Sequence, residues 1–210
     1  MTDKNYTALM FIVDRSGSMQ DIRDDMVGGL TTLLEEQKRL PGLFTIDMAQ
    51  FNNTIDTVHQ MASPENVTIT VERGGGTAPY DAIGIGVNGF IQRIAALPEH
   101  AKPHAIQVVV VTDGAEHSST EYTAQQVKAL ITDKQSDDCW DFFFLGANQD
   151  AVVAGGELGF REDASMTFAA RGDKVHEMSQ ATRRSIRDRR SETREGSSTD
   201  ERDRSAGGEH

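Results

Sequence analysis

Oxygen-bearing side chains follow an apolar run near the start of the chain. Asp14, Ser16 and Ser18 stand at alternate positions directly after the run ALMFIV. Carboxylate and hydroxyl oxygens are hard donors of the kind that bind Mg2+, Mn2+ or Ca2+ in proteins. Alternate spacing can aim these oxygens to one side, and Gly17 is expected to allow a sharp bend between the serines. The predicted chemistry is coordination of a divalent cation.

Two more oxygen donors occur after or before apolar segments farther along the chain. Thr77 lies in the stretch RGGGTAP, and Asp113 follows the apolar run AIQVVVV. Two aspartates and three hydroxyls nearly neutralise a divalent ion, and Mg2+ would keep a coordination position open for an outside anionic oxygen. We therefore predict a site for Mg2+, with Mn2+ or Ca2+ as alternatives. Its predicted ligands are Asp14, Ser16, Ser18, Thr77 and Asp113.

The stretch DRSGS also has a purely structural interpretation. Asp14 and the two serines could cap a helix that begins near Met19. Considered alone, the stretch does not distinguish a cap from a metal site. The additional presence of Thr77 and Asp113 favours the metal site.

Three short, continuous apolar runs are typical of strands buried on both faces of a parallel sheet. They cover residues 8–13, 105–111 and 141–145. Two alternating segments, 43–51 and 54–61, flank an Asn-Asn pair and predict a β-hairpin.

Helical patterns lie between these strands. The first is stopped by Pro41-Gly42, the second begins at Pro79, and the third is expected to be capped by Ser119 or Thr120. The predicted helices cover residues 26–40, 79–97, 118–134 and 172–186.

Strands that alternate with helices predict an α/β fold, a doubly wound Rossmann-like three-layer sandwich. We expect a central, mostly parallel six-stranded sheet with one antiparallel edge strand. The strand of residues 8–13 should lie beside that of 105–111, because the predicted ligands meet only then. Ligands of such sheets bind beyond the carboxyl ends of the strands.

The last part of the chain differs in composition from the rest. Beyond residue 186 the only apolar residue is Ala206, within a mixed-charge sequence rich in arginine. We predict a folded domain over residues 1–186 and a disordered tail over 187–210. Deleting residues 190–210 should leave the melting temperature nearly unchanged, which a thermal melt of the shortened chain would check; a large loss of stability would show that the tail docks on the domain.

Charge and composition limit the expected partners. The 210 residues carry a net charge of -12, which disfavours nucleic acid as a ligand. No apolar run approaches the roughly 20 residues needed to span a bilayer, and the start lacks the pattern of a secretory signal. With a single cysteine, Cys139, the chain is expected to be cytoplasmic. We expect a monomer that binds neither nucleic acid nor membrane.

The motifs together resemble the von Willebrand factor A (vWA) family over about residues 6–186. DRSGSM is similar to its D-x-S-x-S motif, GGGTAPYDAI to its threonine loop, and TDG to its second aspartate. The resemblance implies the vWA fold and a metal-ion-dependent adhesion site (MIDAS). It implies that Ser16, Ser18 and Thr77 contact the ion, while Asp14 and Asp113 act directly or through water.

The resemblance also implies a protein partner, whose Asp or Glu side chain completes the metal coordination. Residues 142–160 further resemble small stand-alone bacterial and phage members, some found among tellurium-resistance proteins. A second, adjacent metal site is not expected, because Ile22 stands beside Asp21 where paired acids would be needed.

An enzymatic alternative is an Mg2+-dependent phosphotransferase or hydrolase of haloacid-dehalogenase-like architecture. That class needs a second aspartate where this chain has Ser16, and its phosphate-binding lysine is missing from the matching loops. No nucleophile–base pair is evident, so we expect a binding module and no enzyme.

Three other polar residues are candidates for lesser roles. Asp81 could orient the threonine loop or could favour a helix N-terminus through its charge. Glu116 and His117 follow Asp113 and could contact a partner or be ordinary exposed loop residues.

Overall fold

The computed structural model describes residues 3–72, 74–113, 118–137, 139–147 and 150–168. The predicted helix over 172–186 and the predicted tail over 187–210 lie outside the described residues, as do Glu116 and His117.

A six-stranded sheet forms the middle layer, in the order β3-β2-β1-β4-β5-β6. All neighbouring strands pair in parallel except β3, which is antiparallel to β2. The predicted fold class is therefore confirmed, including the neighbouring placement of the strands that contain residues 8–13 and 105–111. The strands are β1 (Asp3–Asp14), β2 (Leu43–Phe51), β3 (Ile55–Ala62), β4 (Pro103–Thr112), β5 (Trp140–Ala147) and β6 (Ser165–Phe168).

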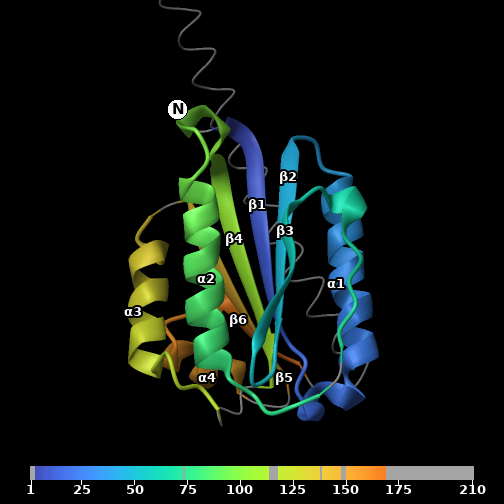
Figure 1. Ribbon diagram of the computed structural model, residues 1–210, viewed down its shortest axis with the longest axis vertical. Helices are drawn as coiled ribbons and strands as arrows, with labels where there is room; N and C mark the ends of the chain where they lie inside the picture. The colour runs from blue at the N-terminus through green and yellow to red at the C-terminus, as the bar shows by residue number, and fades with distance from the viewer. Residues whose placement is uncertain (1–2, 73, 114–117, 138, 148–149, 169–210) are drawn as a thin grey trace, which may run out of the picture.

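Helices cover both faces of the sheet (Figure 1), with α1 on one face and α2 and α3 on the other. Within the described ranges, no helix is both long and apolar enough to cross a membrane. The α-helices of these ranges are α1 (Arg23–Lys38), α2 (Pro79–Ala95), α3 (Ala124–Gln135) and α4 (Ala151–Glu157).

Strand β1 shows why its apolar run is continuous. Leu9 and Phe11 belong to the core cluster on the α1 side, whereas Met10 and Ile12 belong to the cluster beneath α2 and α3. Successive side chains of a strand point to opposite faces, so a strand covered on both faces favours apolar residues along most of its length. This burial on both faces is consistent with the place of β1 in the middle of the sheet. The carboxyl end of β1 lies at the lower edge in Figure 1.

The start of α3 differs from the prediction. The helix begins at Ala124 and its cap is Thr123, where a helix from residue 118 capped by Ser119 or Thr120 was expected. The Thr123 hydroxyl accepts the Gln126 backbone N–H, and the Gln126 side chain accepts the Thr123 N–H, which makes a capping box. Residues 119–122 instead bond to the start of α2, as described below.

Two elements were absent from the sequence prediction. Helix α4 contains Gly155 and Gly156, which are poor helix formers, and β6 has only four residues. Both are held by tertiary contacts, since the Ala151 N–H donates to the Thr167 hydroxyl over 2.8 Å.

Candidate metal centre

Asp14 is the last residue of β1, and its carboxylate is fully buried. One oxygen, Oδ1, accepts the backbone N–H of Ser16 over 2.7 Å. The other, Oδ2, accepts the hydroxyl of Thr112 over 2.7 Å. Thr112 ends β4, and the pairing of Val13 with Val111 brings the two strand ends side by side. The predicted convergence of these two loops is therefore present.

The side chains of Ser16 and Ser18 lie next to each other, between the buried Asp14 carboxylate and the surface. Their Oγ atoms are 3.1 Å apart, with Ser16 buried and Ser18 exposed. Ser16 precedes a short 3-10 helix, Gly17–Asp21, but makes no side-chain cap bond, and α1 begins without one as well. The capping interpretation of DRSGS is therefore not supported.

The expectation for Gly17 is wrong. Its φ is not among the positive values of the chain, and a Cβ there would meet nothing within 4 Å. The bend comes from the turn that the Asp14 carboxylate makes with the Ser16 N–H, so the position does not require glycine.

Thr77 is buried on a loop that follows residue 72. Backbone hydrogen bonds tie this loop to residues 15–18 after β1, here called the first loop. The Gly74 N–H donates to the Arg15 carbonyl over 3.1 Å, and the Gly17 N–H donates to the Gly75 carbonyl over 3.4 Å. The structure thus places the Thr77 loop against the loop that carries the serines.

The turn between β2 and β3 supports the Thr77 loop. This support was not predicted from the sequence. The Asn52 side-chain amide donates to the Gly74 carbonyl over 2.6 Å, and the Asn52 backbone carbonyl accepts the Ala78 N–H over 2.9 Å. Gly74 and Gly75 have φ of 126° and 91°, and a Cβ at Gly75 would lie 2.8 Å from the Asn52 amide nitrogen. Glycine is therefore required here, because L side chains disfavour these φ values.

Asp113 follows Thr112 and is half-buried. Its Oδ1 atom is buried and has no hydrogen-bond partner among the described residues. A buried acceptor without a partner costs free energy, so an unpaired carboxylate oxygen calls for a donor or a cation.

The pKa of Asp14 also favours a cation at this position. Burial raises the pKa of Asp14 from 3.8 to about 6, because desolvation disfavours the charged form. Hydrogen bonds from Ser16 and Thr112 oppose this rise, and the charge of Asp113 adds to it. A cation between the two carboxylates would remove both the repulsion and the unpaired acceptor.

The donor set is rich in hydroxyls. In the part of the chain that the structure describes, no three His, Cys, Asp or Glu side chains gather into a metal-binding group. A cation at this edge of the sheet would therefore depend on hydroxyl oxygens as well as on the two aspartates. Hard, neutral oxygen donors of this kind suit Mg2+ or Ca2+ better than softer ions.

Asp81 has a role that neither sequence interpretation included. It lies in the first turn of α2 and accepts the backbone N–H groups of Thr120, Glu121 and Tyr122 over 2.7–2.9 Å. The Ser119 hydroxyl accepts the Asp81 N–H over 3.3 Å in return. These bonds hold residues 119–122 against the start of α2, close to the Thr77 loop.

We predict that Asp81→Ala lowers the free energy of unfolding by about 1–3 kcal/mol, because three backbone donors lose a charged acceptor. Urea denaturation would measure the loss, and Asp81→Asn should recover part of it. Asp24→Ala is the matched control, since Asp24 is an exposed acid in the first turn of α1. Equal effects at both positions would show that only the helix N-terminus matters.

Comparisons with known proteins agree on the fold. No family model and no curated protein matches the chain. A solved structure of proximal thread matrix protein 1 from the mussel byssus, with a zinc-occupied MIDAS motif, is similar with a TM-score of 0.65 and 14% identity. That match covers 88% of this chain and 46% of the mussel protein.

Two bacterial structures are similar as well. The pilus adhesin SpaC from Lactobacillus rhamnosus GG matches with a TM-score of 0.63 and 12% identity, over 86% of this chain and 30% of the adhesin. A von Willebrand factor type A protein from Catenulispora acidiphila matches with a TM-score of 0.56 and 16% identity, over 85% of this chain and 42% of that protein. The chain thus has the fold of vWA domains, and it spans less than half the length of each of these proteins.

Proposed function

We propose that this chain is a metal-dependent protein-binding module that captures an acidic side chain of a partner. The proposed ion is Mg2+, with Mn2+ or Ca2+ as alternatives. The observation that carries the proposal is the buried Asp113 oxygen directly after β4, which has no hydrogen-bond partner among the described residues, beside the desolvated Asp14 carboxylate. The proposed ligands are Asp14, Ser16, Ser18, Thr77 and Asp113.

Asp14 and the two serines have distinct tasks in this proposal. Asp14 supplies charge at the centre and fixes the first loop through its bond to the Ser16 N–H. The paired hydroxyls of Ser16 and Ser18 reach from the buried carboxylate toward the exposed surface. When bound, a divalent cation would supply an electrophilic centre with a position open to a carboxylate from outside.

The similar structures support binding rather than catalysis. One belongs to a byssus matrix protein with zinc at its MIDAS motif, and another to a pilus adhesin. We propose a protein partner that offers Asp or Glu, with no role for nucleic acid or membrane. We further propose that the chain acts as a cytoplasmic monomer and is not an enzyme.

We also propose that the chain is of the small stand-alone bacterial or phage type, related to tellurium-resistance proteins. Support for this placement comes from the resemblance of residues 142–160 alone. In the structure this stretch includes the end of β5 and the whole of α4.

The test is a pull-down from extracts of the source organism with the full chain as bait. Mg2+ should permit capture of a protein that a chelator releases, and Asp14→Ala bait should not capture it. Substituting single Asp and Glu residues of the captured protein should identify one that is required. Capture that persists with chelator and with Asp14→Ala would overturn the proposal.

A further inference from the structure

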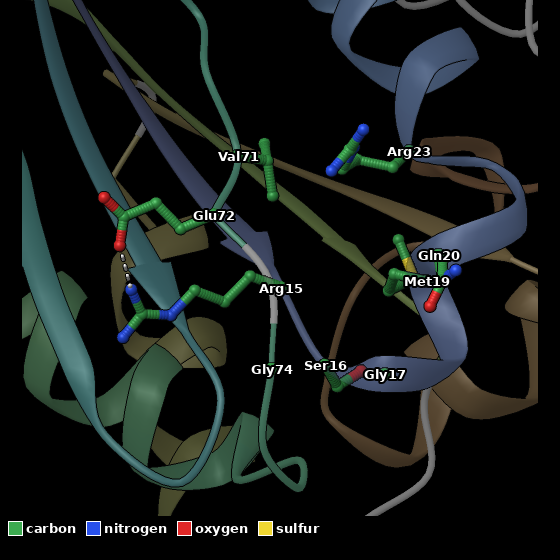
Figure 2. A pocket seen from close by; sticks show the side chains of 9 residues that line it. All are labelled: Arg15, Ser16, Gly17, Met19, Gln20, Arg23, Val71, Glu72 and Gly74. Atoms are coloured by element: carbon green, nitrogen blue, oxygen red, sulfur yellow. Dashed lines mark ion pairs between the residues drawn. The ribbon is translucent and has the colours of Figure 1, made fainter.

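A pocket opens beside the first loop of the candidate metal centre, on the side facing α1 (Figure 2). Its volume is about 90 Å³. Ser16 and Gly17 form its edge toward the metal centre, so a partner segment could contact both places at once. Side chains that line the pocket include Arg15, Met19, Arg23, Val71 and Glu72.

The walls of the pocket are largely apolar. Met19 and Val71 line it, and both are almost completely buried, at 1% and 9% exposure. In Figure 2 Arg23 extends from the start of α1 toward Val71. The floor of the pocket is thus apolar, with Val71 more accessible than Met19, and a guanidinium lies close to it.

The two arginines differ in how fully they are neutralised. Arg15 is 11% exposed in its side chain and forms ion pairs with both Asp56 and Glu72. Arg23 pairs with Asp24, whose side chain is 88% exposed, and the Arg23 Nε and Nη2 atoms both donate to one carboxylate oxygen. An exposed pair of adjacent residues contributes about 0–1 kcal/mol, so a better-placed carboxylate could replace Asp24.

The second terminal nitrogen of Arg23, Nη1, makes no hydrogen bond or ion pair with the described residues. Its donors are therefore available to a ligand. Because guanidinium groups bind carboxylates in pairs of parallel hydrogen bonds, a carboxylate matches this position best.

We propose that this pocket receives a glutamate side chain of the partner, in addition to the carboxylate captured at the metal centre. Met19 and Val71 hold the methylene groups of the glutamate, and Arg23 binds its carboxylate. Aspartate suits the pocket less well, because its shorter stem buries less apolar surface. The inference rests on the proposed function and adds a second element of partner recognition to it.

The experiment uses a library of peptides with one fixed central Asp and five random residues on each side. The library is selected on the full chain with Mg2+, and again with chelator. The selection is repeated on Arg23→Glu and on Arg39→Glu. Arg39 is exposed and follows the last residue of α1, so its substitution makes the same charge change at the far end of the same helix.

We expect glutamate to be enriched roughly tenfold at one fixed distance from the central Asp, which corresponds to about 1.4 kcal/mol. This preference should persist on Arg39→Glu and should change to Lys or Arg on Arg23→Glu. Thermal melts of both variants show whether they are folded; a negative charge in the first turn of α1 is favourable there.

Mg2+-dependent selection without an acidic preference, or with an apolar preference instead, would overturn this inference and leave the proposed function intact. An acidic preference that persists on Arg23→Glu would also overturn it. Absence of any Mg2+-dependent selection would contradict the proposed function and the inference together.

Discussion

Replacing Asp14 with asparagine should abolish Mg2+ binding and at the same time raise the melting temperature of the metal-free protein by about 5 °C. The charge that binds the cation is expensive to bury when no cation is present. A pKa of about 6 instead of 3.8 corresponds to roughly 2–3 kcal/mol lost from the stability at neutral pH. Asparagine removes this cost and the ligand charge together.

The hydrogen bonds of Asp14 can survive the substitution. The asparagine Oδ1 can still accept the Ser16 N–H. Its NH2 group can donate to the Thr112 hydroxyl, which then accepts a hydrogen bond instead of donating one. The gain in stability should therefore come from the removed charge and not from altered packing.

The pH dependence of this gain follows from the direction of the shift. Because the pKa of Asp14 is higher in the folded protein, the folded state binds more protons than the unfolded state between about pH 4 and 6. The metal-free wild type should thus lose stability as the pH rises through this window. The advantage of Asp14→Asn should be full at pH 7 and should vanish near pH 4.

Calorimetric titration with Mg2+ and thermal melts with and without chelator measure both effects. Asp24→Asn, an exposed acid of α1, is the control and should change neither. A destabilised Asp14→Asn protein would show that the fold needs the buried charge. Mg2+ binding equal to that of the wild type would show that the Asp14 charge does not hold the ion.

Replacing Thr77 with alanine should weaken partner binding more than Mg2+ binding. Thr77 is buried, and its hydroxyl makes no hydrogen bond to the described residues, so its removal leaves the fold intact. Its loop joins the first loop through two backbone bonds, at 3.1 and 3.4 Å. We expect this hydroxyl to join the metal mainly when the partner does, so that one lost oxygen costs the complex about tenfold in affinity.

Thr77→Ser is the matched control, because it keeps the hydroxyl and removes only a methyl group. Titrating Mg2+, and then a peptide from the library selection, into both variants separates the two affinities. Equal losses of metal and peptide binding in Thr77→Ala would mean that Thr77 is a permanent ligand. No loss in either would remove it from the site.

The fold could be predicted because strands buried on both faces have continuous apolar runs in the sequence. Residues 8–13 are apolar at every position and residues 105–111 at every position but Gln107, and such runs indicate central strands. Helix α4 and strand β6 leave no comparable mark, since they are short and are held by contacts between distant residues. The capping box of Thr123 and Gln126 is present in the sequence, but Ser118 and Glu121 have the same spacing, so the pattern alone does not locate the start of α3.

The candidate ligands could be predicted from residue type and spacing, but their supports could not. Asp14 and its partner Thr112 are 98 positions apart, and only the strand order brings them together. Asp81 and Asn52 likewise bind loops that lie far from them in sequence. Hydrogen bonds of this kind follow from the finished fold, and no local pattern announces them.

The most direct test of the central claim is anomalous X-ray diffraction from crystals of the full chain grown with Mn2+. Mn2+ prefers the same hard oxygen donors as Mg2+ and scatters anomalously. We predict one strong peak at the carboxyl edge of the sheet, bounded by oxygens of Ser16, Ser18 and Thr77, with Asp14 and Asp113 behind them. A saturating Mn2+ concentration that leaves this position empty, or a peak held by other residues, would contradict it.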